Sequence, residues 1–67
     1  MPYVNVRITP GATRRQKAEL IAGVTELLVR VLDKNPDTTH VVIDEVEPDN
    51  WGLGGLPVDE FRKRGNG

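Results

Sequence analysis

The stretch TRRQKAELIAGVTELLVRVL, residues 13–32, decides the fold of this chain. Thr13 and Gln16 have the spacing of a capping box, in which two side chains satisfy free backbone amides at a helix start. Apolar side chains then recur at steps of three and four, which is typical of a helix with one apolar face. They are Leu20, Ile21, Val24, Leu27, Leu28, Val31 and Leu32. The pattern predicts a helix of about 20 residues that ends before Pro36, because proline disfavours helical geometry in the preceding residue.

A strand is predicted on each side of this helix. Residues 3–9 alternate apolar Val4, Val6 and Ile8 with other side chains, which is the period-two pattern of a strand with two different faces. Residues 39–46 are rich in β-branched side chains and form the second predicted strand. A helix that connects two strands of one sheet makes them parallel, with a right-handed crossover. We therefore expect an α/β fold built on one β-α-β unit.

The predicted helix covers only one face of this two-stranded sheet. The opposite face would carry Tyr3, Asn5, Arg7, His40, Val42 and Asp44. A two-stranded sheet with an uncovered, partly apolar face is not stable alone. A chain of 67 residues also has a small core, since domains of about this size bury only about 60% of their unfolded surface. We therefore expect the protein to assemble as an oligomer.

Composition excludes several classes of protein. The chain has no cysteine and a single histidine, so it has neither a disulfide framework nor the ligands of a zinc site. Its net charge of −1 argues against general nucleic-acid binding, which depends on neutralising phosphates. No apolar run approaches the roughly 20 residues of a membrane span, and the N-terminus lacks the pattern of a signal peptide. We expect one domain over residues 1–67, located in the cytoplasm, with a small molecule or protein as its partner.

The C-terminal third begins with a glycine-rich segment. Residues 50–58, NWGLGGLPV, have glycines where tight turns and left-handed backbone are needed, which indicates a hairpin or an arm. Trp51 is the only tryptophan of the chain, and it fits an arm that reaches over a neighbouring subunit. Residues 62–67 are basic and then glycine-rich, and we expect them to form a flexible tail.

Pro2 directly follows the initiator methionine. A small residue at this position normally permits removal of Met1, which would leave the nitrogen of Pro2 as a secondary amine at the chain terminus. The rigid ring would hold this base in one direction. Alternatively, Pro2 is only a tolerated first residue of a strand, where it has no ladder hydrogen bond to lose.

Taken in order, these features resemble the 4-oxalocrotonate tautomerase family. The resemblance rests on the Met-Pro start, Gly11 before a capped helix, the pair Gln16 and Lys17, and a β-branched second strand that ends in Asp44-Glu45. The late run from Trp51 to Gly55, an aromatic residue followed by Gly-x-Gly-Gly, completes it. The similarity spans nearly the whole chain.

Membership would imply the following chemistry. Met1 is lost, and Pro2 acts as a general base that moves a proton between an enol oxygen and a carbon of an unsaturated 2-oxo acid, without a cofactor or a metal. Trp51 stands where the family carries an aromatic residue of the pocket, although it also fits plain interface packing. The family resemblance further implies a homohexamer arranged as a trimer of dimers.

The chain departs from the family at two positions. Members that act on dicarboxylates carry an arginine directly after the glycine that precedes the helix, and another early in the second strand. Here Ala12 and His40 occupy these positions. Alanine cannot replace a bidentate guanidinium, and histidine replaces it only in part. Arg14 and Arg15 are the candidates to bind a substrate carboxylate in its place, and His40 is a candidate to donate to a carbonyl oxygen.

Two other functions remain open from the sequence. A hydratase or dehalogenase would use protonated Pro2 as an acid, with Asp44, Glu45 or Glu47 activating water. A non-catalytic subunit, or a module that binds small acids, would keep the fold without the arginines.

Overall fold

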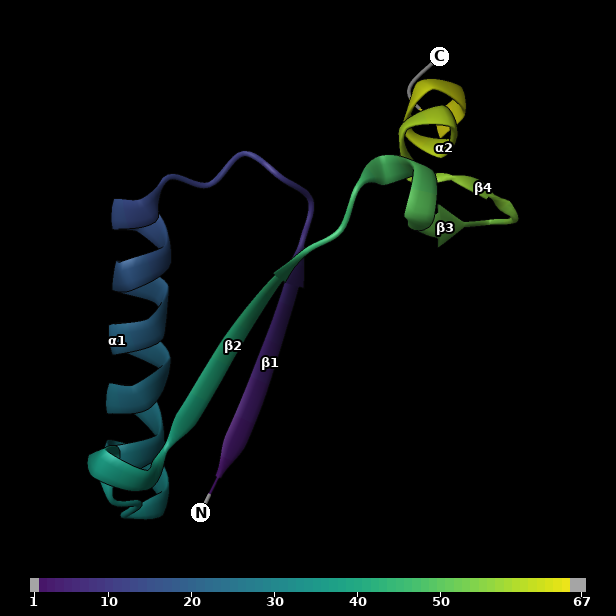
Figure 1. The fold of residues 1–67 in the computed structure, drawn as a ribbon. Coiled ribbons are helices and arrows are strands. Elements are labelled where there is room, and N and C mark those ends of the chain that lie inside the picture. Colours follow the sequence, from purple (N-terminus) through teal and green to yellow (C-terminus); the bar gives the residue numbers. More distant parts are fainter. Residues whose placement is uncertain (1, 66–67) are drawn as a thin grey trace.

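The computed structural model describes residues 2–65, so Met1, Asn66 and Gly67 lie outside the described residues. Its first part is the predicted β-α-β unit (Figure 1). Strands β1 (Tyr3–Ile8) and β2 (His40–Glu45) pair in parallel, with Tyr3 opposite His40 and Ile8 opposite Glu45. Helix α1 (Arg14–Leu32) connects them along one face of the sheet. The prediction of an α/β fold with parallel strands is confirmed, and each strand is slightly shorter than expected.

Helix α1 begins and ends where its sequence predicts. The backbone amide of Gln16 donates to the Thr13 hydroxyl at 3.1 Å, and the amide of Thr13 donates to the Gln16 side chain at 2.9 Å. Asp33 ends the helix in the left-handed conformation, with φ of 56°, and its amide donates to Val29. A 3-10 turn over Pro36–Thr38 then leads into β2. The capping box thus fixes the start of α1, and Pro36 follows its end, where the chain turns into β2.

The glycine-rich segment forms a hairpin. After a 3-10 turn at Pro48–Asn50, strands β3 (Gly52–Leu53) and β4 (Leu56–Pro57) pair antiparallel. The two residues between them, Gly54 and Gly55, have φ of 62° and 82°. Two positive φ angles in a two-residue loop are the geometry of a type I′ turn, which glycine adopts at little cost. The predicted hairpin is therefore confirmed.

The prediction of a flexible tail over residues 62–67 is wrong for residues 62–65, and its last two residues, 66–67, lie outside the described residues. These residues belong to a second helix, α2 (Val58–Gly65). Acidic residues occupy its first turn and basic residues its last turn, which complements the helix dipole. Val58, at the start of the helix, is buried at 4% exposure. The basic run is therefore the polar end of a docked helix.

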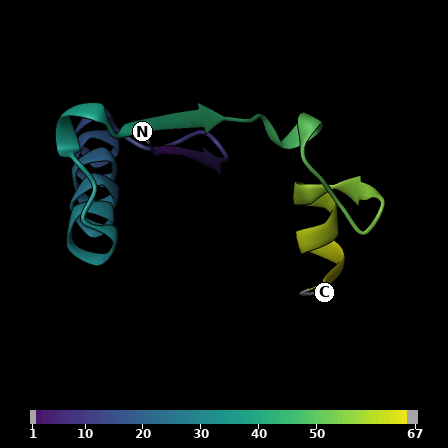
Figure 2. The same cartoon turned by 90° about the horizontal axis from the view of Figure 1, so that it is seen from below.

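The isolated chain leaves much apolar surface uncovered. Among the described residues, Val58 is the one apolar side chain that is buried. The exposed ones include Tyr3, Leu20, Ile21, Leu27, Val31, Leu32, Val42, Leu53 and Phe61. The radius of gyration is 15.4 Å, whereas a compact domain of this length has roughly 11 Å. Figure 2 shows why: the hairpin and α2 stand away from the sheet and α1.

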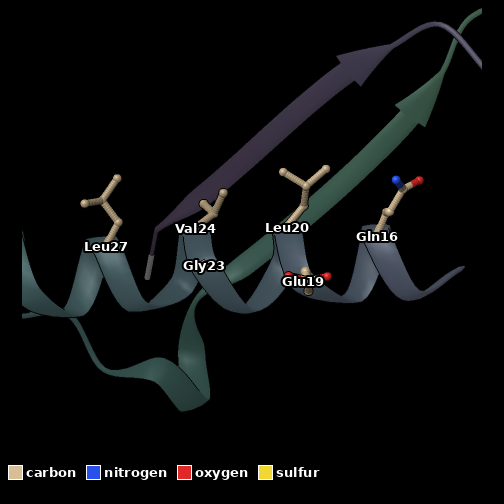
Figure 3. A pocket seen from close by; sticks show the side chains of 6 residues that line it. All are labelled: Gln16, Glu19, Leu20, Gly23, Val24 and Leu27. Atoms are coloured by element: carbon tan, nitrogen blue, oxygen red, sulfur yellow. The ribbon is translucent and has the colours of Figure 1, made fainter. Parts of the chain in front are cut away.

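One uncovered region lies along α1. Leu20, Val24 and Leu27 line an open hollow of about 480 Å³, with Gly23 between them (Figure 3). No strand residue lines this hollow, so it belongs to a part of the helix that the sheet of its own chain does not cover. Neither described helix has the length and hydrophobicity needed to span a lipid bilayer.

Candidate active site

Pro2 and His40 lie together at one end of the sheet. Pro2 directly precedes β1 and is half-buried. Its carbonyl oxygen accepts a hydrogen bond of 2.9 Å from the backbone amide of His40. Tyr3 is the first residue of β1 and is opposite His40, so this bond extends the parallel ladder to the residue before the strand. The second strand therefore fixes the backbone of the candidate base, and the predicted partner His40 is its neighbour.

Trp51 lies beyond the opposite end of the sheet. It follows the 3-10 turn after β2, and its carbonyl oxygen accepts a hydrogen bond of 2.7 Å from the amide of Val58. Strands rise about 3.3 Å per residue, so the six residues of β1 alone separate the two ends by nearly 20 Å. Figure 1 shows the N-terminus and the β3-β4 hairpin at these opposite ends. Pro2 and Trp51 of one chain therefore do not share a pocket.

Arg14 and Arg15 also lie far from Pro2 of their own chain. Both are exposed in the first turn of α1, which runs opposite to the strands. An ion pair marks where this end of the helix lies: Lys17 Nζ is 2.7 Å from Glu45 Oε1, and Glu45 is the last residue of β2. Of the predicted site residues, the structure thus brings together only Pro2 and His40.

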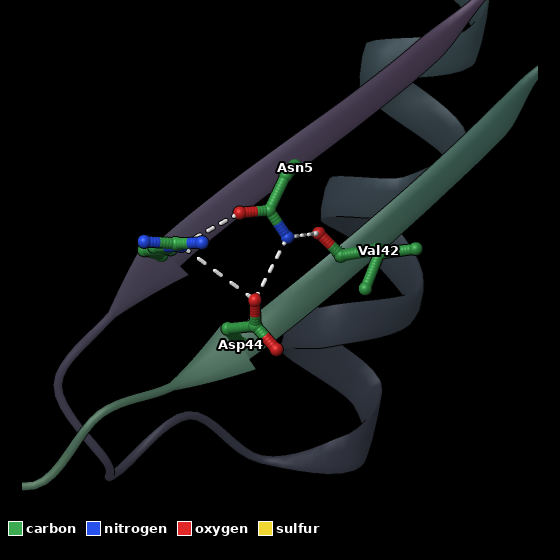
Figure 4. Close-up of polar contacts among 4 residues, drawn as sticks. Asn5, Val42 and Asp44 are labelled. Atoms are coloured by element: carbon green, nitrogen blue, oxygen red, sulfur yellow. Dashed lines mark hydrogen bonds and ion pairs between the residues drawn. The ribbon is translucent and has the colours of Figure 1, made fainter.

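Two of the three carboxylates considered for activating water, Asp44 and Glu45, make polar contacts at this same far end, whereas Glu47 follows β2 and is exposed. Asn5 Nδ2 donates to Asp44 Oδ2 at 3.0 Å and to the carbonyl oxygen of Val42 at 3.3 Å (Figure 4). The hydrogen bond from Lys17 holds the pKa of the Glu45 carboxyl below its ordinary value. Asp44 and Glu45 are opposite Arg7 and Ile8 in the register, and therefore distant from Pro2.

Sequence reasoning missed two residues near Trp51. Arg7, from β1, and Arg62, from α2, line one hollow of about 410 Å³ together with Trp51. The alternation of β1 predicts that Arg7 lies on the uncovered face, but nothing local links it to Trp51. The composition of residues 62–67 predicts a tail, whereas Arg62 belongs to α2 and its place depends on how that helix packs. Within residues 2–65, no group of acidic or histidine side chains converges as metal ligands would.

Comparison with known proteins gives a consistent result. The family model described as "Tautomerase enzyme" matches residues 2–60. The chain is 63% identical over 65 residues to "Probable tautomerase K2" of Dickeya dadantii (strain 3937), covering 96% of this chain and 97% of that protein.

Solved structures share the fold. The crystal structure of DmpI from Helicobacter pylori superposes with a TM-score of 0.83 at 45% identity, covering 88% of this chain and 98% of that one. A heterohexamer 4-oxalocrotonate tautomerase from Chloroflexus aurantiacus J-10-fl gives a TM-score of 0.82 at 27% identity, covering 92% of this chain and 100% of that one. The resemblance seen in the sequence is therefore confirmed at the level of both sequence and fold.

Proposed function

The chain belongs to the tautomerase family, and we propose that it is a cofactor-free isomerase in which the nitrogen of Pro2 acts as the general base. The observation that carries this proposal is the position of Pro2. It starts the first strand, is half-buried, and has its backbone tied to His40 by a 2.9 Å hydrogen bond. After removal of Met1, its secondary amine would be a base with a fixed direction at the end of the sheet.

The proposed reaction moves one proton within the substrate. The amine takes the proton of the enol hydroxyl, the oxygen lone pair forms the carbonyl, and the electrons of the C=C bond take the proton back at carbon. An enol becomes a 2-oxo acid, and Pro2 ends in its starting state. General bases of this kind typically accelerate a reaction about 10²–10⁴-fold. We assign His40 the role of a donor to the substrate oxygen that becomes the carbonyl.

The proposed pocket is shared between chains. Trp51 lies at the end of the sheet opposite to Pro2, so it can reach a substrate at Pro2 only from another copy. The uncovered apolar surface of α1 supports such an assembly, because exposed patches of this kind mark contact sites. A relative from Chloroflexus aurantiacus J-10-fl is a heterohexamer. For this chain we propose a hexamer of identical copies, built from three dimers.

An enol assay tests this function. Turnover of phenylenolpyruvate and of 2-hydroxymuconate is followed by ultraviolet absorbance for the parent and for Pro2→Ala, after intact mass spectrometry has established that Met1 is absent from both. We expect Pro2→Ala to lower kcat/KM at least about 100-fold. Pro10→Ala is the matched control, because Pro10 lies in an exposed loop after β1, and it should retain parental activity.

The same assay separates the alternatives. If the parent and Pro2→Ala are equally inert across a panel of enols, the chain is a non-catalytic subunit or a module that binds small acids. If the parent instead adds water to an unsaturated acid, the hydratase mechanism replaces the tautomerase mechanism.

A further inference from the structure

Two arginines from distant parts of the chain line one hollow beside Trp51. Arg7 comes from β1 and Arg62 from α2, and both line the hollow of about 410 Å³ that Trp51 also lines. The remaining side chains around it are mostly apolar, namely Ile8, Thr9, Leu53 and Val58. An apolar hollow with two cations has the composition of a site for a small organic anion.

Arg7 is held by its neighbours. Its Nε donates to Asn5 Oδ1 at 2.9 Å and lies 3.7 Å from Asp44 Oδ2. Asn5 in turn donates to Asp44 at 3.0 Å, so the three side chains form one network on the uncovered face (Figure 4). A guanidinium has five N–H donors, and the network uses the one on Nε. The two terminal amino groups remain for an acceptor, and the side chain is 70% exposed.

Arg62 is placed by the packing of α2 on the hairpin. Val58 is buried, and its amide donates to Trp51 at 2.7 Å. The ring of Phe61 lies against Gly54, where an added Cβ would stand 2.7 Å from Phe61 Cε2. These contacts fix both ends of the turn that precedes Arg62. Its position beside Trp51 therefore follows from a packed helix rather than from a free tail.

We propose that Arg7 and Arg62 bind a carboxylate group of the substrate beside Trp51. The proposal rests on the proposed function, because it assumes that this hollow faces Pro2 of another copy. Ala12 has no charge, and His40 lacks the guanidinium fork, so the chain needs another cation for a substrate that carries a second carboxylate. Arg7 and Arg62 supply it, and they make this chain selective for dicarboxylate over monocarboxylate enols.

Binding is measured first, without turnover. Trp51 is the only tryptophan, so a change in tryptophan fluorescence arises at a residue that lines this hollow. Adipate, an unreactive dicarboxylate, is titrated into the assembled protein, and adipamide of the same length serves as the uncharged control. We expect a saturable change with adipate and none with adipamide. Arg7→Gln and Arg62→Gln should each weaken adipate binding about tenfold or more, the size expected for one lost charge-assisted hydrogen bond.

Matched variants control for folding and for general charge. Arg64→Gln removes a positive charge from the same helix without touching the hollow, and it should bind adipate like the parent. Arg7→Lys keeps the charge but loses the fork, and its affinity should fall between those of the parent and Arg7→Gln. Circular dichroism and native mass spectrometry establish that each variant keeps its fold and assembly.

Kinetics complete the test. Both glutamine variants should raise the KM for 2-hydroxymuconate about tenfold, with a smaller change in kcat and little change for phenylenolpyruvate. The inference is overturned if both variants bind adipate like the parent, or if the parent shows no saturable response by fluorescence and by calorimetry. If Pro2→Ala abolishes turnover in that case, the proposed function stands alone. If adipate binding depends on both arginines but no enol is turned over, the carboxylate site stands and the proposed function fails.

Discussion

The backbone amide of His40 donates a hydrogen bond of 2.9 Å to the carbonyl oxygen of Pro2. The contact that ties the candidate base to the second strand therefore involves no side chain of His40. Any residue with an N–H at position 40 can make it, so the side chain is available for another role. In the proposed mechanism, that role is to donate to the substrate oxygen.

This separation of backbone and side chain predicts the behaviour of His40→Ala. The variant keeps the bond to Pro2, so its melting temperature should stay close to that of the parent. Its kcat/KM for phenylenolpyruvate should fall about tenfold, the value of one hydrogen bond to the reacting oxygen. Unfolding curves and enol assays check both statements. An unchanged kcat/KM would mean that the side chain of His40 only fills an interface.

The ion pair between Lys17 and Glu45 predicts a pH-dependent stability. The hydrogen bond from Lys17 lowers the pKa of Glu45 in the folded state. Because this carboxyl has a lower pKa in the folded than in the unfolded chain, its ionisation stabilises the fold at a pH above the unfolded pKa. This contribution disappears as the pH falls through the folded pKa. Lys17→Gln should therefore melt below the parent near pH 7, and the difference should vanish near about pH 2.

The more exposed pair of Lys63 and Glu60 is the control for this experiment. Their charged atoms are 3.7 Å apart, and the Lys63 side chain is 76% exposed. Exposed pairs contribute little to stability, so Lys63→Gln should match the parent at both pH values. A difference between parent and Lys17→Gln that persists at low pH would show that Lys17 acts through packing instead.

The two glycines of the hairpin predict unequal effects. Both have positive φ, so alanine at either position costs roughly 1–2 kcal/mol in backbone strain. At Gly54 the new methyl would also lie 2.7 Å from the ring of Phe61, whereas at Gly55 it meets nothing within 4 Å. Gly54→Ala should therefore lower stability more than Gly55→Ala in chemical denaturation. It should also shift the fluorescence emission of Trp51, because the clash with Phe61 displaces α2 from the hairpin. Equal effects would contradict this packing.

The uncovered face of α1 predicts how assembly can be broken. Leu27 is 49% exposed in the isolated chain and lines the hollow along the helix. A charge buried there in an interface would cost several kcal/mol, so Leu27→Glu should reduce the oligomer to smaller species in native mass spectrometry. Glu26→Gln, next to it on the exposed surface, should leave the mass unchanged. An intact oligomer of Leu27→Glu would place the interface elsewhere.

Much of the fold follows from rules that act over a few residues. The capping box of Thr13 and Gln16, the proline after α1 and the alternation of β1 all depend on neighbours near in sequence, and each appears as predicted. The hairpin follows from two adjacent glycines. The composition of the basic run near the C-terminus predicts a tail, which differs from the structure. In the structure this run ends a helix that packs on the hairpin through buried Val58 and through Phe61 against Gly54.

The amino-acid sequence by itself determined the β-α-β unit, the hairpin and the position of Pro2, because periodicity, capping and turn chemistry are local properties. Tertiary structure alone decided which side chains meet. It put His40 beside Pro2 at one end of the sheet, and it put Arg7 and Arg62 beside Trp51 at the other end. Strand register and helix docking are set by contacts between residues far apart in the chain, and no pattern within either segment encodes them.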